Sequence, residues 1–226
     1  MASRDYCGIA RQYAADILGG KIPACKWVKL AVDRQLADLK MYVGDRSLYV
    51  FDENEANRVC KFIELLTHTK GELAGTRIHL EPWQVFILTT VFGWLRRADG
   101  GRRYRRAYVE VSRGNGKSTL CSGIGLYCLL ADREGGAEVY SFATTRDQAK
   151  IVFGDAKVMA ERNAPLRNKF GLQVLANALY VPTSNSTFQA KSAEGSTLDG
   201  LNTHLAIIDE LHAHKTRAVY DVVETS

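Results

Sequence analysis

Several features that mark membrane, fibrous or disordered chains are missing from this sequence. No apolar run reaches the roughly eighteen residues that a membrane-spanning helix needs. Only 4 prolines occur among 226 residues, and the chain contains neither an internal repeat nor a low-complexity tract. It is 46% hydrophobic and 24% charged, which is ordinary for a globular protein. The chain is therefore long enough and apolar enough to build one α/β core.

Cysteine is also scarce, and its pattern indicates no special chemistry. The five cysteines are Cys7, Cys25, Cys60, Cys121 and Cys128. Their odd number argues against a disulfide framework, and their spacing is not that of zinc ligands. Cys121 and Cys128 are seven residues apart on one face of a predicted helix, which favours core packing. Because residues 1–15 also lack a hydrophobic signal region, we expect a reduced, cytoplasmic protein with no membrane partner.

Apolar periodicity divides the chain into a helical front and an α/β core. Residues 1–77 form a predicted N-terminal helical segment packed on the core, with helices over 6–18, 24–39 and 53–67. Residues 78–226 form the predicted core, with helices after Lys117 and after Asp147. Its strands are predicted over 106–112, 137–143, 178–181, 187–190 and 204–209. This alternation predicts a mostly parallel sheet sandwiched by helices.

A glycine-rich loop follows the first predicted core strand. The run Ser112-Arg113-Gly114-Asn115-Gly116-Lys117-Ser118-Thr119 leads into an apolar, helix-compatible segment over 120–130. Backbone N–H groups of such a loop can surround phosphate oxygens, and the helix N-terminus adds its positive dipole end. Lys117 would place its charge between the terminal phosphates, and the Ser118 hydroxyl would bind Mg²⁺. The loop therefore predicts a P-loop NTPase core that binds a nucleoside triphosphate.

One position departs from the usual pattern of Gly, four residues, Gly, Lys and then Ser or Thr. Val111 stands where the first glycine is expected. An ordinary helix N-terminus with a solvated lysine is the alternative interpretation. The order of strand, glycine-rich turn and helix favours the phosphate loop.

Two adjacent carboxylates end a second apolar strand. Asp209 and Glu210 follow the run 205–208, which suits a parallel strand covered on both faces. Asp209 would hold Mg²⁺ through water, and Glu210 would orient or deprotonate the water that attacks the γ-phosphate. An exposed loop is the alternative for such a pair, but the upstream phosphate loop favours catalysis. We therefore expect Lys117, Asp209 and Glu210 to meet around one triphosphate.

Two further groups of side chains leave alternatives open. Six arginines surround the turn at 99–101, namely Arg96, Arg97, Arg102, Arg103, Arg105 and Arg106. They could track phosphates or receive an acidic partner, or they could form a solvated loop. His212 and His214 could complete a metal site with the acidic pair, but no third ligand follows at a convincing interval. A role in coupling or helix capping is preferred for these histidines.

Taken in this order, the motifs resemble those of one family, the large subunits of tailed-bacteriophage terminases, which package DNA into empty capsids. The resemblance spans essentially the whole chain. Beyond the glycine-rich loop it rests on Tyr13-Ala14, on residues 20–26, on Leu80-Glu81-Pro82-Trp83-Gln84, and on Asp199-Gly200-Leu201-Asn202 leading into residues 207–214. Val111 in place of the first glycine and Arg113 inside the loop are similar to the terminase version of the motif.

The resemblance implies roles that spacing alone does not assign. Gln84, with Trp83 beside it, resembles an adenine-reading motif, whereas the residues alone indicate a helix start with a buried tryptophan. Arg113 would reach the γ-phosphate from within its own subunit. Arg146 is the candidate for a second arginine that a neighbouring ring subunit supplies. An ordinary arginine at a helix start is the alternative for Arg146.

The resemblance further implies an ATPase motor that uses ATP and Mg²⁺ to move double-stranded DNA into a procapsid. The implied partners are DNA, the portal protein, the terminase small subunit and further copies in a ring, in the host-cell cytoplasm. No cluster of carboxylates remains for a two-metal nuclease site, so nuclease activity is not expected within 1–226. The motor core itself is expected to be truncated at its C-terminal end.

Three other functions share some of these residues. A helicase-like nucleic-acid remodelling ATPase would use the same phosphate loop and acidic pair. A nucleotide-binding docking module with little turnover would keep the fold and lose the chemistry. A small-molecule kinase is disfavoured, because Glu210 directly after Asp209 suits the activation of water rather than of an acceptor hydroxyl.

Overall fold

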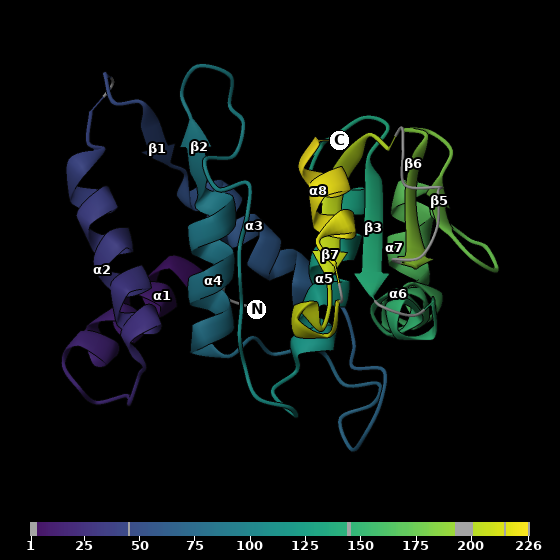
Figure 1. The fold of residues 1–226 in the computed structure, drawn as a ribbon, viewed down its shortest axis with the longest axis horizontal. Coiled ribbons are helices and arrows are strands. Elements are labelled where there is room, and N and C mark those ends of the chain that lie inside the picture. The colour runs from purple at the N-terminus through teal and green to yellow at the C-terminus, as the bar shows by residue number, and fades with distance from the viewer. Residues whose placement is uncertain (1–3, 45, 144–145, 193–200, 215, 226) are drawn as a thin grey trace. The chain divides into compact units, whose positions relative to one another are not determined.

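The computed structural model describes residues 4–44, 46–143, 146–192, 201–214 and 216–225 (Figure 1). The chain divides into two compact units. Unit 1 comprises residues 1–64 and 79–110, and unit 2 comprises residues 65–78 and 111–226. No helix in the described ranges combines the length and the apolar character needed to cross a membrane.

Unit 1 is a small helical assembly with one short antiparallel strand pair. Its elements are α1 (Tyr6–Leu18), α2 (Lys26–Met41), β1 (Tyr49–Phe51), α3 (Glu53–Ile63), α4 (Pro82–Gly93) and β2 (Trp94–Arg96). The three predicted helices are confirmed, although α3 ends at Ile63 rather than near residue 67. Helix α4 packs against both α1 and α3, and most of its residues are buried. Helix α4 therefore packs on α1 and α3, although the predicted domain boundary between residues 77 and 78 lies between it and them in sequence.

Local sequence explains where these helices begin. The Asp5 carboxylate accepts a hydrogen bond from the Gly8 backbone N–H at 2.8 Å, and Asp52 caps α3 in the same way. At the start of α4, Glu81 and Gln84 form a reciprocal capping box, and Pro82 occupies the first turn. Such caps satisfy N–H groups that have no partner within the helix.

Most of the six clustered arginines have partners inside unit 1. Arg103 lies 2.9 Å from the Asp38 carboxylate and is enclosed by four aromatic rings. The ring centroids of Tyr42, Tyr49, Trp94 and Tyr104 lie 4.5–5.2 Å from its guanidinium carbon. Arg96 forms an ion pair with Asp99, and Arg97 donates to the Gly44 carbonyl. Much of this positive charge therefore stabilises the fold through ion pairs and cation–π contacts.

Unit 2 contains a five-stranded sheet in the order β4-β5-β6-β3-β7. Its elements are α5 (Lys117–Leu130), β3 (Glu138–Ala143), α6 (Arg146–Glu161), α7 (Ala164–Phe170), β4 (Gln173–Val174), β5 (Leu179–Val181), β6 (Ser186–Ser192), β7 (Thr203–Ile208), the 3₁₀ turn η1 (Leu211–Ala213) and α8 (Ala218–Thr225). Strand β3 is parallel to β6 and β7, whereas β5 is antiparallel to both of its neighbours, β4 and β6.

The expectation of a mostly parallel sheet is wrong, because the sheet is mixed. The four strands predicted after residue 130 are all present, but β4, β5 and β6 are joined by short turns. A short turn can only join antiparallel neighbours, since a parallel crossover needs a dozen or more residues. The few residues between these strands therefore dictate the antiparallel half of the sheet.

The predicted strand over 106–112 is also wrong. Residues 104–112 are extended, yet they carry no strand pairing within the described part of the chain, and Tyr108 is 74% exposed. The β-branched and aromatic residues of this segment favour an extended backbone. A strand also needs the N–H and C=O groups of a neighbour, and that requirement is not visible in local sequence.

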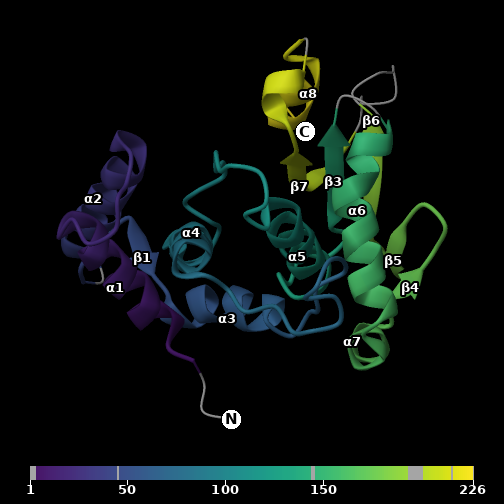
Figure 2. The same ribbon diagram turned by 90° about the horizontal axis from the view of Figure 1, so that it is seen from below.

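Helices cover both faces of the parallel part of the sheet. The Ser141 hydroxyl of β3 donates to the Ala149 carbonyl of α6, so one face of β3 lies against that helix. The alternate residues Tyr140 and Phe142 pack with Val219 of α8. In Figure 2, β7 lies between α5 and α8. This double cover buries β3 almost completely, whereas most residues of β7, the edge strand that leads to the candidate site, are half-buried.

Segment 65–78 is anchored on α6 within unit 2. The Thr69 hydroxyl donates to the buried Asp155 carboxylate at 3.0 Å, and Lys70 lies 2.9 Å from the same group. Asn163 donates its side-chain amide to the Leu65 carbonyl, and Arg162 donates to the His68 carbonyl. The segment is therefore held by side chains from the C-terminal half of α6 and just beyond it.

Two helical glycines provide a test of this packing. A methyl group at Gly125 in α5 would lie 2.6 Å from the Phe188 ring, whereas one at Gly154 in α6 would meet nothing within 4 Å. We expect Gly125→Ala to lower the free energy of unfolding by about 1–3 kcal/mol through overpacking. The matched Gly154→Ala should raise it by about 0.5–1 kcal/mol, because alanine favours helix. Urea denaturation of both variants measures these changes, and equal effects would contradict the α5–β6 packing.

Candidate phosphate-binding site

The glycine-rich loop ends in a helix N-terminus, as the sequence predicts. Gly114 and Gly116 have φ values of 83° and 71°, in the left-handed region that favours glycine, and Gly116 is the N-cap of α5. The Asn115 side-chain amide donates to the Ser112 hydroxyl at 2.7 Å and to the Ser112 carbonyl at 3.1 Å. Residues 112–116 are exposed. The loop is therefore internally braced while its backbone stays open to solvent.

The acidic pair lies where β7 ends. The Asp209 N–H donates to the Phe142 carbonyl at 3.0 Å, which continues the parallel ladder by one residue. Glu210 then takes a left-handed conformation with φ 49° and ψ 48°, and its N–H donates to the Asp209 carboxylate at 3.0 Å. This conformation is unfavourable by about 1–2 kcal/mol for a residue with a Cβ atom. Despite this strained turn, both carboxylates lie within reach of one ammonium group.

Lys117 joins the loop to the acidic pair. Its ammonium donates to Glu210 Oε1 at 2.7 Å and lies 3.2 Å from Asp209 Oδ1. The side chain of Asp209 is 13% exposed, whereas those of Lys117 and Glu210 are 31% and 37% exposed. The structure thus brings together the three residues that the sequence expects to meet, although 93 residues separate Lys117 from Glu210.

The contact shifts the protonation equilibria of both partners. The hydrogen bond and charge of Lys117 lower the pKa of Glu210, with smaller contributions from His212 and Arg113. The Glu210 hydrogen bond in turn raises the pKa of Lys117, against partial desolvation. Each group stabilises the charged form of the other. The site therefore holds a fully ionised pair at neutral pH.

The other predicted site residues have varied positions. Ser118 and Thr119 are half-buried in the first turn of α5, and Arg113 is exposed in the loop. Trp83 and Gln84 lie in unit 1, where Gln84 Oε1 accepts from the Glu81 N–H at 2.9 Å. The expected helix start is therefore confirmed, but Trp83 is half-buried rather than buried. Arg146 is the first residue of α6, but its side chain is outside the described part. Asp199 and Gly200 are outside the described residues.

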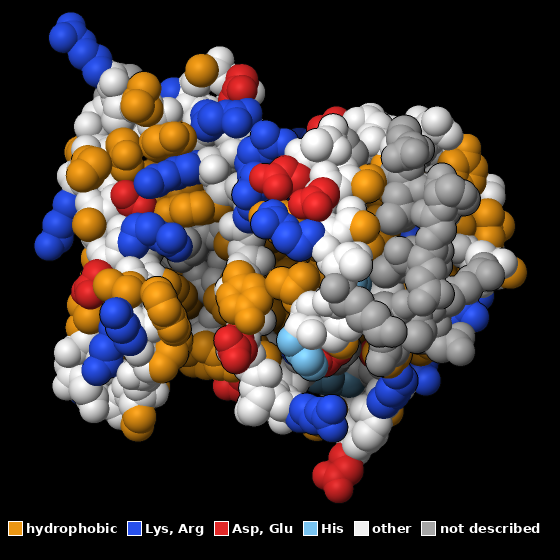
Figure 3. All heavy atoms as spheres, viewed as in Figure 1, with side chains coloured by type: hydrophobic (Ala, Val, Ile, Leu, Met, Phe, Trp, Pro, Cys, Tyr) orange, Lys and Arg blue, Asp and Glu red, His pale blue; other side chains and the backbone are white. Residues whose placement is uncertain are grey.

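The histidines after the acidic pair do not form a metal site in the described structure. His212 Nδ1 lies 3.5 Å from Glu210 Oε2, and the His212 side chain is 81% exposed. Across the described ranges, Asp209 and Glu210 belong to no group of three clustered metal ligands. Figure 3 shows histidine side chains, in pale blue, exposed on one face of the molecule.

One neighbour of the site was predicted only as a core residue. Cys121 is one turn after Lys117 on α5, and burial raises the pKa of its thiol to about 12. The nearby Asp209 charge acts in the same direction and Lys117 opposes it. Cys121 is therefore an uncharged group behind the ion pair. Its seven-residue spacing to Cys128 indicates a shared helix face, but sequence does not show what that face covers.

Comparisons with known proteins agree with this arrangement. Residues 82–226 match the family model of the terminase large subunit, ATPase domain. The chain is 32% identical over 155 residues to the terminase large subunit of Enterobacteria phage HK97, covering 68% of this chain and 30% of that protein. The crystal structure of the HK97 bacteriophage large terminase is similar with a TM-score of 0.61 at 27% identity, covering 76% of this chain and 35% of that one.

The chain belongs to the family of terminase large subunit ATPase domains. It spans about a third of the length of the HK97 protein. The family resemblance stated from the motifs is therefore confirmed.

The ion pair predicts a pH dependence of stability. Because the pKa of Glu210 is lowered in the folded state, its contribution is present above the unfolded value of about 4.3 and is lost as pH falls through the lower folded value. The contribution should be below about 1 kcal/mol, since both partners are about one-third exposed. Denaturant unfolding of wild type and Glu210→Gln at pH 3 to 7 measures the difference.

The expected result is a gap between wild type and Glu210→Gln that closes on acidification. Exposed Glu134, beyond the other end of α5, provides the matched control variant Glu134→Gln. A gap for Glu210→Gln that stays constant with pH would show that the ion pair does not form in solution.

Proposed function

We propose that this chain is the ATPase motor domain of a DNA-packaging terminase, which couples ATP hydrolysis to translocation of double-stranded DNA into a procapsid. The observation that carries the proposal is the position of Lys117 within 3.2 Å of both Asp209 and Glu210, at the start of α5 and the end of β7. A helix N-terminus, a cation and two carboxylates then surround one site. Family membership supports the same function.

The chemistry of the donors fits a nucleotide with Mg²⁺. Asp209 and the Ser118 hydroxyl offer oxygen ligands of the kind that this hard cation prefers. When bound with ATP, Mg²⁺ would neutralise phosphate charge and leave the γ-phosphoryl group open to attack. The N–H groups of 114–119 would hold phosphate oxygens. Arg113, exposed in the loop, would add a second positive charge near the γ-phosphate.

Lys117 would act as a charge that moves between two partners. In the absence of nucleotide it neutralises Glu210, which keeps the pKa of that carboxyl low and makes it a weak base. A triphosphate carries more negative charge than one carboxylate, so it would draw the ammonium toward the phosphates. Glu210 would then lose its main stabilising partner and become a better proton acceptor for the attacking water. Binding would thereby activate the base.

The remaining assignments follow from the family and complete the proposal. Arg146, at the start of α6, would contribute to a neighbouring subunit in a homo-oligomeric ring. DNA, the portal protein and the terminase small subunit would be the partners, in the host-cell cytoplasm. No nuclease activity is expected from residues 1–226. The helical segment over 1–77 would pack on an ATPase core over 78–226 through α4, which follows the boundary in sequence and packs against α1 and α3.

Two substitutions separate nucleotide binding from hydrolysis. Glu210→Gln should retain ATP binding and lower the rate of ATP hydrolysis by at least about a hundredfold, since the catalytic base is lost. Lys117→Ala should weaken ATP binding itself. Fluorescent-nucleotide titration measures binding, and phosphate release with Mg²⁺ or EDTA, with and without duplex DNA, measures turnover.

Glu134→Gln is the control and should leave both quantities unchanged. Equal hydrolysis by wild type and Glu210→Gln would refute the assignment of the base. Tight binding with no turnover in any condition would favour a docking module. Hydrolysis coupled to strand separation would favour a helicase-like enzyme.

The adenine role of Gln84 can be tested while an acceptor is kept at the start of α4. Its side-chain carbonyl caps the helix, so Gln84→Glu keeps an acceptor there while removing the amide donor that would contact the adenine edge. We expect the preference for ATP over GTP to fall about tenfold, the effect of one hydrogen bond of about 1.4 kcal/mol. Competition binding measures the ratio, and an unchanged ratio would leave Gln84 with its capping role alone.

A further inference from the structure

A second cluster of ligating side chains lies at the opposite end of α5 and β7. Cys128 is in the last turn of α5, Asp132 follows that helix, and His204 is the second residue of β7. One potential ligand atom from each residue lies within 4.8 Å of the other two. Cys128 is 1% exposed, and the side chains of Asp132 and His204 are 10% and 17% exposed. The cluster is therefore nearly enclosed.

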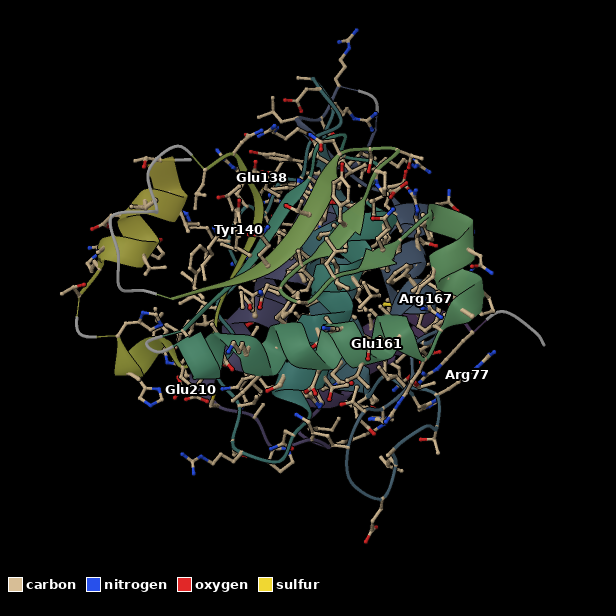
Figure 4. All side chains as sticks on the ribbon, turned by 90° about the vertical axis from the view of Figure 1, so that its right-hand side faces the viewer. Arg77, Glu138, Tyr140, Glu161, Arg167 and Glu210 are labelled. Atoms are coloured by element: carbon tan, nitrogen blue, oxygen red, sulfur yellow. The ribbon has the colours of Figure 1, made fainter. Side chains whose placement is uncertain are left out.

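The cluster is distant from the candidate phosphate site. Eleven residues of helix separate Cys128 from Lys117, which corresponds to about 16 Å. Five residues of strand separate His204 from Asp209, a similar distance. Figure 4 shows Glu210 and Glu138 near opposite ends of the sheet. His204 lies at the Glu138 end, because Glu138 pairs with Thr203, the residue before His204.

A β-bulge positions the histidine. Glu138 pairs with Thr203 and Val139 pairs with Leu205, so His204 is the extra residue on β7. Regular alternation would place His204 on the face of Ala206, which packs with the cluster under α8. Instead, His204 Nε2 lies 2.7 Å from Asp132 Oδ2, at the end of α5. Bulges commonly redirect a side chain in this way at functional sites.

We propose that Cys128, Asp132 and His204 bind one Zn²⁺ ion or a similar borderline-soft divalent metal. Thiolate, imidazole and carboxylate are all zinc ligands, whereas Mg²⁺ and Ca²⁺ prefer oxygen alone. Bond lengths of about 2.0–2.3 Å in a tetrahedron place ligand atoms about 3.3–3.6 Å apart, within the observed limit. Binding would lengthen the His204–Asp132 contact by about half an ångström and release the Cys128 proton. A water molecule would complete the tetrahedron.

The ion would brace two elements that carry the phosphate site. Cys128 and Asp132 fix the C-terminal end of α5, and His204 fixes the start of β7. The opposite ends of the same elements hold Lys117 and Asp209. The expected effect is therefore on stability, and it is separate from the proposed ATPase chemistry.

Cobalt titration of the metal-free, reduced 226-residue protein tests the proposal. Co²⁺ should bind at one equivalent with a thiolate charge-transfer band and the intense visible bands of tetrahedral coordination. Zn²⁺ should displace it and raise the thermal midpoint by about 5–10 °C at a hundredfold excess over Kd. Cys128→Ser should abolish the charge-transfer band. Asp132→Asn should weaken Zn²⁺ binding at least about tenfold.

Cys25→Ser is the matched control, because Cys25 is an exposed cysteine that could bind metal adventitiously. This variant should retain the full signal. A wild-type protein without the thiolate band, or a band lost in Cys25→Ser and kept in Cys128→Ser, would overturn the proposal. Circular dichroism of each metal-free variant checks folding. If Cys128→Ser is unfolded, the isosteric Asp132→Asn decides, and unchanged affinity in that variant would overturn the site.

Discussion

The contact of Lys117 with Asp209 and Glu210 is the interaction on which the candidate site depends. It joins the first residue of α5 to the two residues after β7, two elements that are distant in sequence. Neither the exposed glycine loop nor a strand end with two acids would have a defined chemistry alone. Together they place cationic, anionic and backbone N–H groups around one space. That combination suits a highly charged ligand. Without the ligand these charged groups pair with one another, and with it they would pair with the charges of the ligand.

The same contact shows why the nucleotide-free protein tolerates such a dense group of charges. Asp209 is largely buried, and a buried carboxylate is costly unless it is paired. The lysine and the Glu210 N–H supply its partners. The left-handed turn at Glu210 is the conformational cost of this arrangement, since it turns the second carboxylate onto the same ammonium. Strain in the backbone and neutralisation of charge thus occur at the same three residues.

Local chemistry explains what the sequence could predict. Gly114 and Gly116 indicated a loop with left-handed positions, and apolar periodicity located α1, α5 and α6 closely. Non-local pairing explains what it could not. The segment at 106–112 has the composition of a strand but pairs with no strand in the described structure, and short turns made half of the sheet antiparallel. Likewise, Cys128, Asp132 and His204 gather across 72 residues of intervening chain, so no spacing rule identifies them.

The bulge at His204 has a consequence for the carboxylates that follow β7. A bulge absorbs one residue locally, so β7 keeps its pairing with β3 from Leu205 onward whatever the register at Thr203. Asp209 therefore keeps its hydrogen bond to Phe142 despite the extra residue at His204. The irregularity at the start of β7 therefore leaves the carboxylates at its other end in register with β3.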